Sequence, residues 1–206
     1  ILSHDATPAP LNYHGFPKSI CTSINDCICH GVPSPKAKLK DGDIVNVDVT
    51  VLKDGYHGDT STMFFIGVVS DEAKRIADVA KEAMMKGIAE VAPGATTGDI
   101  GFAVNKYVTK NGLWVVKEIG GHGIGKIFHD DPWIPSYGKK GKGEELPPWI
   151  CLTVEPMINQ SAAPLREVDI PGSTHKEYYT GDGTLSAQYE HTVLVTDSGH
   201  QVLTLP

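Results

Sequence analysis

Two aspartates that could bind a metal ion lie on either side of a predicted turn. Asp48 interrupts an apolar, alternating stretch, and Asp59 follows shortly after the pair Asp54-Gly55. Asp-Gly between β-prone stretches is a strong hairpin signal, so we expect a hairpin over residues 43–66. Its pairing would bring both carboxylates near each other on one sheet face, where a cation would relieve their repulsion. The alternative is that Asp48 is a hydrogen-bonded strand residue and Asp59 a turn residue.

Further candidate ligands lie in the second half of the chain. His122 is surrounded by glycines at residues 120–125, which let a ligand approach the backbone closely. Glu155 and Glu190 each interrupt an apolar, strand-like stretch, where an unpaired charge would be costly. Four carboxylates and one imidazole suit divalent Mn, Fe, Co or Zn, and bridging carboxylates suit a pair of such ions. The pattern therefore indicates a dinuclear hydrolase.

The cysteines offer a different metal chemistry. Cys27-Ile28-Cys29-His30 could begin a structural zinc site, but no second Cys or His pair at finger spacing completes a tetrahedron. A chain of 206 residues does not need disulfides to supply missing core stability. The four cysteines therefore favour reduced thiols and a cytoplasmic location.

Periodicity predicts the elements that must position these side chains. Apolar residues recur at helical spacing over residues 71–91 and 97–111, and Pro-Gly or Asn-Gly follows each stretch. Strands followed by helices and further strands favour an α+β fold with helices on one face of an antiparallel sheet. Strands are expected at 20–24, 114–119, 150–156 and 187–196, and irregular segments at 138–145 and 161–183.

Composition narrows the class of protein. The chain is 40% hydrophobic and 21% charged, and we expect one soluble catalytic domain over residues 1–206. A net charge of −7 and the lack of a basic block disfavour nucleic acid as a partner. No apolar run is long enough to predict a membrane span. Because the chain starts at Ile1, we also expect that a native N-terminal segment is missing.

In these motifs the sequence resembles the type I methionine aminopeptidases of metallopeptidase family M24. The resemblance covers nearly the whole chain, and the order and spacing of its motifs are specific. It implies a pita-bread fold, with pseudo-twofold halves around an antiparallel sheet and metals held between them. The matching motifs lie at residues 13–19, 29–33, 41–43, 48–59, 120–125, 153–157 and 186–192.

The resemblance also implies a role for each candidate ligand. Asp48 would chelate one of two divalent ions, Asp59 and Glu190 would bridge both, and His122 with Glu155 would complete the other site. The activity implied is removal of N-terminal methionine by a metal-bound hydroxide, with Glu155 taking its proton. His129 would hydrogen-bond the scissile carbonyl oxygen, and His30 would contact the substrate amide.

Substrate and partners follow from the same resemblance. The substrates would be N-terminal Met peptides and nascent polypeptides, acted on by a monomer with transient ribosome association, without membrane or specific nucleic-acid partners. A monovalent site for Na⁺ or K⁺ would fall on Asn25, Cys27 and Ser186. The methionine side chain would enter an apolar slot lined by Tyr13, Phe16, Cys21 and Phe128, with His30 and His129 beside it.

Several departures and two rivals bear on this interpretation. Pro10 stands where many relatives have a small pocket residue, Pro147-Pro148-Trp149 replaces a Pro-Gly turn, and residues 161–183 lack an aligned pocket tryptophan. The rival enzyme is a proline-specific aminopeptidase or dipeptidase, which would share the ligands but not the motifs at 13–21 and 29–31. The rival of another class is a noncatalytic binding relative, which would lack several ligands. All five are present here.

Overall fold

The computed structural model describes residues 1–205 as one large antiparallel sheet, two smaller sheets and two helices. The large sheet has the order β1-β4-β5-β14-β9-β7-β8, with β2 added beside β4 and β15 beside β14. The smaller sheets are β13-β10-β6 and β11-β12-β3. The strands are β1 (Thr7–Pro8), β2 (Cys21–Ile24), β3 (Cys27–Cys29), β4 (Ile44–Lys53), β5 (Tyr56–Phe65), β6 (Trp114–Val115), β7 (Gly121–Ile124), β8 (Asp130–Ile134), β9 (Cys151–Val154), β10 (Met157–Asn159), β11 (Leu165–Asp169), β12 (Lys176–Thr180), β13 (Ser186–Gln188), β14 (Glu190–Val195) and β15 (His200–Val202).

The longest strands form the predicted hairpin. Strands β4 and β5 are joined by Asp54-Gly55, both with positive φ (53° and 82°), as the primed hairpin turns require. Thr50 pairs with Asp59, and Asp48 pairs with Ser61. Because side chains alternate along a strand, Asp48 and Asp59 are diagonal neighbours on one face. The predicted juxtaposition of these two residues is confirmed.

The two predicted helices form with slightly earlier ends. Helix α1 (Asp71–Ile88) begins where the Ser70 side chain accepts a hydrogen bond from the Ala73 amide. Helix α2 (Thr97–Lys110) begins with a capping box in which Thr96 and Asp99 bond each other's backbone. Neither helix is long and apolar enough to cross a membrane, among the residues described.

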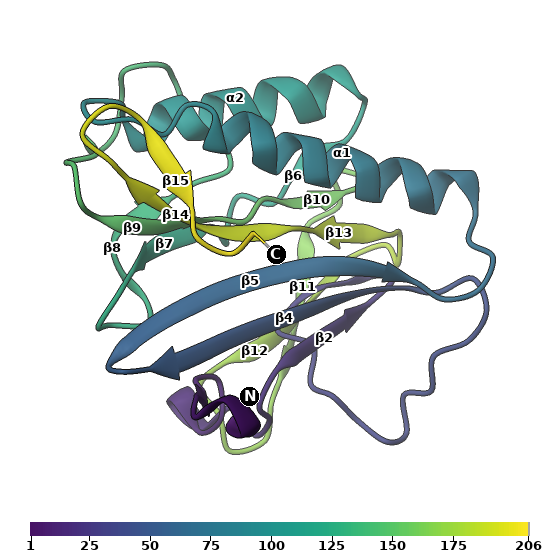
Figure 1. Ribbon diagram of the computed structural model, residues 1–206. Helices are drawn as coiled ribbons and strands as arrows, with labels where there is room; N and C mark the ends of the chain where they lie inside the picture. Colours follow the sequence, from purple (N-terminus) through teal and green to yellow (C-terminus); the bar gives the residue numbers. More distant parts are fainter. Residues whose placement is uncertain (206) are drawn as a thin grey trace.

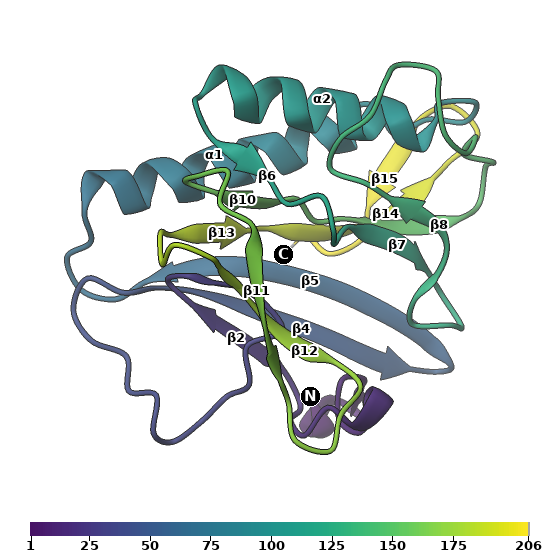
Figure 2. The same cartoon turned by 180° about the vertical axis from the view of Figure 1, so that it is seen from behind.

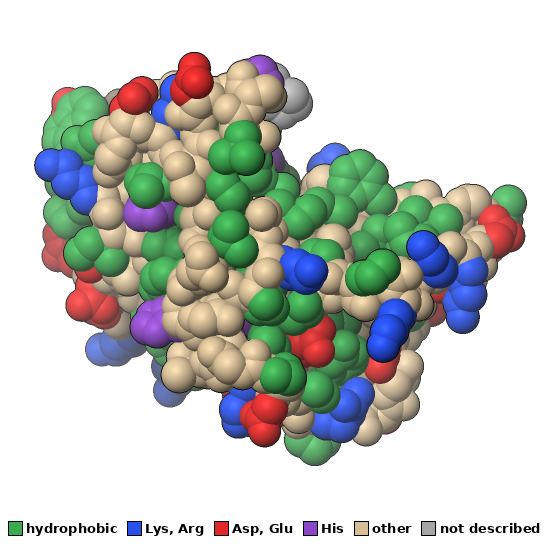
Figure 3. Space-filling model, turned by 90° about the horizontal axis from the view of Figure 1, so that it is seen from below, with side chains coloured by type: hydrophobic (Ala, Val, Ile, Leu, Met, Phe, Trp, Pro, Cys, Tyr) green, Lys and Arg blue, Asp and Glu red, His purple; other side chains and the backbone are tan. Residues whose placement is uncertain are grey.

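Both helices lie on the same side of the molecule, above β6, β10 and β13 (Figures 1 and 2). One core cluster, including Ile76, Ala80 and Ile158, fills the space between them and the β10–β13 sheet. A second, including Met84, Leu152 and Val193, joins the helices to β9 and β14. On the opposite side, hydrophobic side chains reach the surface among charged ones (Figure 3). The packing of α1 and α2 thus holds β9, β10, β13 and β14 in a fixed arrangement.

Three strand predictions need correction. The strand expected at 114–119 stops at Val115, because the chain then turns to bring Ile119 and Gly120 to a cavity. The strand expected at 150–156 is only β9, which ends at Val154. The strand expected at 187–196 is broken at Tyr189, where the chain passes from the small sheet (β13) to the large one (β14). Periodicity does not reveal such a change of sheet.

The segment 161–183, expected to be irregular, contains a β-hairpin. Strands β11 and β12 pair over five residues each, and β12 pairs with β3. No residue of β11 is buried, and of β12 only Thr180 is. Their sequences therefore lack the apolar alternation that predicts a strand. The segment 138–145 is irregular, as expected.

Candidate active site

One cavity of about 320 Å³ collects the residues that the sequence singled out for metal and substrate. That volume lies at the lower end of the range for small-ligand pockets. Eleven predicted residues line it: Tyr13, Phe16, Cys21, His30, Asp48, Asp59, His122, Phe128, His129, Glu155 and Glu190. The walls come from β2, β4, β5, β7, β12 and β14, from the 3-10 helix Tyr13–Gly15, and from the segments around residues 30, 119, 128, 155 and 175.

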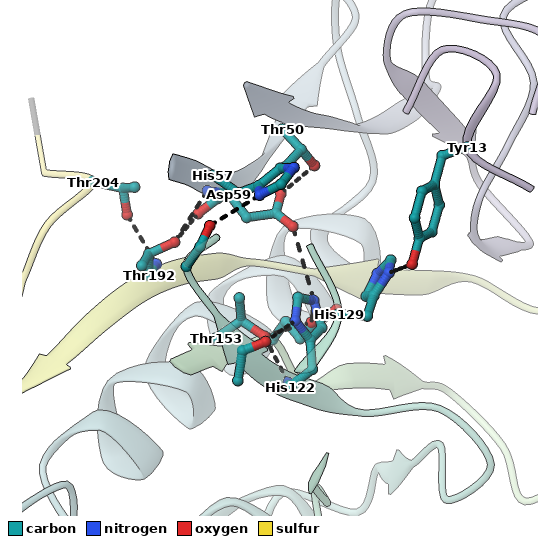
Figure 4. A network of polar contacts seen from close by, with 12 residues as sticks. Tyr13, Thr50, His57, Asp59, His122, His129, Thr153, Thr192 and Thr204 are labelled. Carbon is teal, nitrogen blue, oxygen red and sulfur yellow. Dashed lines mark hydrogen bonds and ion pairs between the residues drawn. The ribbon is translucent and has the colours of Figure 1, made fainter. Parts of the chain in front are cut away.

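On one side of the cavity lies a carboxylate cluster, which consists of Asp48, Asp59, Glu155, Glu190 and the imidazole of His122. One ligand atom each from Asp59, His122 and Glu190 lies within 4.8 Å of the others. His122 Nε2 is 3.5 Å from Glu155 Oε1 and 3.9 Å from Asp59 Oδ2. Figure 4 shows Asp59 and His122 directed toward each other from different strands. The side chains therefore converge although they are separated by up to 142 positions in sequence.

Neighbouring groups fix the orientation of these acids. Thr50 Oγ1 donates a hydrogen bond to Asp59 Oδ1 at 2.7 Å. Thr153 Oγ1 donates to Glu155 Oε1 at 2.8 Å, and Gln188 Nε2 donates to Glu155 Oε2 at 3.0 Å. Each of these donors is buried. The remaining oxygens of the cluster are thus held in place toward the cavity.

Burial and mutual repulsion shift the pKa of every acid in the cluster upward. Burial first, then the charge of Glu155, raises the pKa of Asp48 to about 7. Burial and the charge of Asp59 raise the pKa of Glu155 to about 8. The pKa values of Asp59 and Glu190 are raised for the same reasons. Burial lowers the pKa of His122, so this imidazole favours its neutral, ligating form.

The cluster fits a divalent metal centre. Among residues 1–205, no lysine or arginine lies within 4 Å of any of these four carboxylates. Buried acids without a basic partner are compensated by a bound cation, and oxygen donors with one imidazole suit borderline divalent ions. The donor set thus offers the chemistry that the sequence predicted.

The rest of the cavity lining is mainly aromatic, with one further acid, Glu118. Phe16, Cys21 and Phe128 are buried, and the first two pack against Ile170. At the mouth lies an aromatic rim of Tyr13, His30, Phe128, His129 and His175, whose rings contact one another at centroid distances of 4.1 to 5.6 Å. Burial and the neighbouring His175 lower the pKa of His30 to about 4. Burial therefore disfavours positive charge on this imidazole, whereas the carboxylate cluster attracts positive charge.

The histidine His129 links the two sides. Its ring lies 4.3 Å from that of His122, centroid to centroid, and stacks on Phe128 at 4.1 Å. Its Nδ1 is 2.9 Å from the Tyr13 hydroxyl (Figure 4). His129 is thus held between the carboxylate cluster and the aromatic rim.

The three residues predicted for a monovalent ion lie outside this cavity. Asn25 and Cys27 line a separate groove below β2 and β3. The Ser186 amide donates a hydrogen bond to the Asn25 carbonyl at 2.9 Å, so these two backbones are adjacent. The monovalent site itself remains a prediction.

Sequence reasoning missed part of the rim. His175 was not assigned to the site from the sequence, yet it is half-buried and lines the cavity, as does Tyr178. Both belong to the segment that was expected to be irregular. Pairing of β12 with β3 brings them there, and no local pattern in the sequence signals it.

Comparisons with known proteins agree with this geometry. The sequence pattern of metallopeptidase family M24 matches residues 3–197. The methionine aminopeptidase of Rickettsia prowazekii is 52% identical over 205 residues, which cover 100% of this chain and 78% of that protein. A crystal structure of methionine aminopeptidase from Rickettsia prowazekii superposes with a TM-score of 0.95 at 51% identity, covering 100% of this chain and 81% of that one.

For a proline-specific enzyme the comparison shows likeness of fold alone. The prolidase from Pyrococcus horikoshii superposes with a TM-score of 0.67 at 22% identity, covering 90% of this chain and 47% of that one. The matches confirm the α+β pita-bread fold and the metal-dependent aminopeptidase activity predicted from the motifs. The chain belongs to metallopeptidase family M24 and, within it, to the methionine aminopeptidases.

Proposed function

We propose that the cavity binds the N-terminal methionine of a peptide with its side chain among Tyr13, Phe16, Cys21 and Phe128 and its scissile bond beside the carboxylate cluster. The observation that carries this proposal is the division of one small cavity into an acidic side and an apolar side. An apolar slot suits a thioether, and a carboxylate cluster suits hydrolysis of the adjacent bond.

Asp48, Asp59, His122, Glu155 and Glu190 would hold two divalent ions of the Mn, Fe, Co or Zn class. Such ions would lower the pKa of a water molecule and polarise the scissile carbonyl. The support for this assignment is the donor set itself, which has four buried carboxylates and one neutral imidazole.

The protein's own groups would then move the protons. Glu155 takes the proton of the attacking water at a carboxylate oxygen and returns it to the leaving amine. His129 donates a hydrogen bond from Nε2 to the carbonyl oxygen as negative charge develops there. His30 contacts the substrate amide near the scissile bond. A monovalent ion at Asn25, Cys27 and Ser186 would stabilise the chain beside β3 and β13.

The biological setting is part of the same proposal. N-terminal methionines arise on nascent polypeptides, so the enzyme would act in the cytoplasm as a monomer in transient contact with ribosomes. The four cysteines, none of which forms a disulfide, are compatible with a reducing compartment.

The test is mass spectrometry of peptides incubated with the protein and Mn²⁺ or Co²⁺. Met-Ala-Ser should lose methionine, while Ala-Pro-Ser should remain intact. Because an apolar pocket discriminates by only about 1 to 3 kcal/mol per methylene, norleucine-Ala-Ser should be cleaved appreciably and Lys-Ala-Ser hardly at all. Faster release of lysine than of methionine would overturn the pocket assignment, and cleavage of Ala-Pro-Ser alone would favour the proline-specific activity.

A further inference from the structure

The hydroxyl of Tyr13 has one hydrogen-bond partner among residues 1–205, the ring nitrogen Nδ1 of His129 at 2.9 Å. Figure 4 shows this contact on the side of His129 that faces away from Asp59 and His122. The two imidazole nitrogens are separated by one carbon and diverge. Because Nδ1 is directed at Tyr13, Nε2 is directed away from Tyr13. The centroid of the His122 ring lies 4.3 Å from the centroid of the His129 ring.

The direction of this hydrogen bond determines which nitrogen of His129 carries hydrogen. Above pH 7 an isolated imidazole is neutral, with a hydrogen on one nitrogen and a lone pair on the other. A phenol is a good donor and a weak acceptor, and the Tyr13 hydroxyl has no other acceptor among the described residues. Donation from Tyr13 to Nδ1 places the imidazole hydrogen on Nε2.

The backbone around Tyr13 is held in an unusual conformation. Asn12 and His14, on either side of it, have positive φ angles of 68° and 47°. Such conformations are costly for residues other than glycine and persist where neighbouring contacts enforce them. Here the amide of Thr174, between β11 and β12, donates to the His14 carbonyl at 2.9 Å, and a Cβ on Gly15 would lie 2.4 Å from the Gly172 carbonyl oxygen. The β11–β12 hairpin thus fixes the position from which the Tyr13 hydroxyl contacts His129.

We infer that Tyr13 is a positioning residue: its hydroxyl donates to His129 Nδ1 and so holds His129 in the tautomer that carries hydrogen on Nε2. This inference rests on the proposed function, in which His129 donates from Nε2 to the carbonyl oxygen of the substrate. It gives Tyr13 a task in turnover that is separate from lining the methionine slot.

The variant Tyr13→Phe tests the inference because it removes the hydroxyl and keeps the ring. In the metal-loaded enzyme, kcat for Met-Ala-Ser should fall about tenfold, the upper range for the loss of one such hydrogen bond, while KM changes less than twofold. Tyr107→Phe, the same chemical change on α2 and outside the cavity, should leave both constants unchanged. A large rise in KM with unchanged kcat would show that Tyr13 only binds substrate and would overturn the inference.

A double-mutant cycle separates this inference from the role of His129. If Tyr13 acts through His129, Tyr13→Phe should have no further effect on kcat once His129 is replaced by alanine. An equal loss in both backgrounds would overturn the inference and leave the role of His129 intact. Undiminished kcat in His129→Ala alone would instead overturn the proposed function.

Nuclear magnetic resonance of the imidazole nitrogens provides a readout independent of activity. In ¹⁵N-labelled, Zn²⁺-loaded protein at pH 8, the His129 signals, assigned by their loss in His129→Gln, should show hydrogen on Nε2 only. In Tyr13→Phe they should show a mixture of both tautomers. Hydrogen on Nδ1 in the unaltered protein would overturn the inference.

Discussion

The carboxylate cluster and the aromatic rim share one cavity but differ in how the chain builds them. The cluster stands on β4, β5, β7 and β14 and directly after β9. The rim comes from the short 3-10 helix Tyr13–Gly15 and from loops, and two of the residues that shape it, His14 and His30, have positive φ. Burial raises the pKa of the acids in the first region and lowers the pKa of histidines such as His30 in the second. Burial thus makes the carboxylate cluster favourable for cations and keeps the histidines of the aromatic rim neutral.

Under the proposed function, regular strands would supply four of the five metal ligands, and segments outside the strands would supply most of the groups that contact substrate. Strand geometry fixes the spacing of carboxylates within the tolerance that metal coordination demands. Loops can present several rings at one mouth, because each loop enters from a different part of the chain. Substitutions in the two regions should therefore have different consequences for metal binding and turnover.

The largest effect is expected for Glu190→Ala in the carboxylate cluster. Loss of this proposed metal ligand should remove several kcal/mol of transition-state stabilisation, so activity on Met-Ala-Ser should fall by about 10³-fold or more. Calorimetry should show weakened binding of Mn²⁺. Glu167→Ala, on the exposed strand β11, is the matched control and should change neither quantity. Full metal binding by Glu190→Ala would contradict the assignment of this residue.

The rim should respond differently. His129→Ala should lower kcat by about 10²- to 10³-fold, the usual effect of deleting one oxyanion donor, with a smaller change in KM and unchanged metal stoichiometry. His122→Ala should weaken metal binding directly, so that excess metal partly restores its activity. If excess metal restored the activity of His129→Ala, His129 would also contribute to metal binding, which would contradict the separate roles proposed for the two regions.

The two regions should also oppose each other in the pH dependence of stability. In metal-free protein the raised pKa values of Asp48 and Glu155 mean that the folded state binds protons more tightly than the unfolded state, so stability falls as pH rises. The lowered pKa of His30 acts in the other direction, and its contribution is lost as pH falls below about 6.5.

Between pH 6.5 and 8 the acids should therefore dominate. Stability in the presence of a chelator should decrease by about 2 kcal/mol, which corresponds to a drop in Tm of about 4 to 8 °C. Saturating Mn²⁺ should abolish this slope, because the bound ion replaces the protons. Thermal melts at several pH values, with chelator and with metal, measure both. If the Tm of the metal-free protein rose between pH 6.5 and 8, this would contradict the raised pKa values of the carboxylate cluster.

The smallest effect concerns backbone strain outside the cavity. Trp149 is 64% exposed and has a φ of 70°, a conformation that favours glycine. Trp149→Gly should therefore stabilise the protein by about 1 kcal/mol and leave turnover unchanged. Trp114→Gly, at a paired position in β6, should destabilise it instead. Chemical denaturation of both variants measures the change in stability, and turnover of Met-Ala-Ser by Trp149→Gly shows whether the strain at Trp149 has a role in catalysis.

The sequence predicted the cluster better than the rim for a physical reason. Asp48 and Asp59 are neighbours across a hairpin whose register depends on a local turn, and costly charges in apolar strands indicated Glu155 and Glu190. His122 was indicated by its glycine-rich surroundings. Tyr13, His30 and His129 were assigned only by family resemblance. His175 escaped prediction because its position depends on the pairing of β12 with β3, which joins segments about 150 residues apart.

The place of β14 in the large sheet also determines when the site can exist. This strand lies between β5 and β9, although it is synthesised after both, and it carries Glu190. Until residues 190–195 have left the ribosome, β5 and β9 have no strand between them, and the ligands on either side remain in separate halves. Pairings of such long sequence separation form late in folding. The proposed metal centre can therefore assemble only after residues 190–195 are free to pair with β5 and β9.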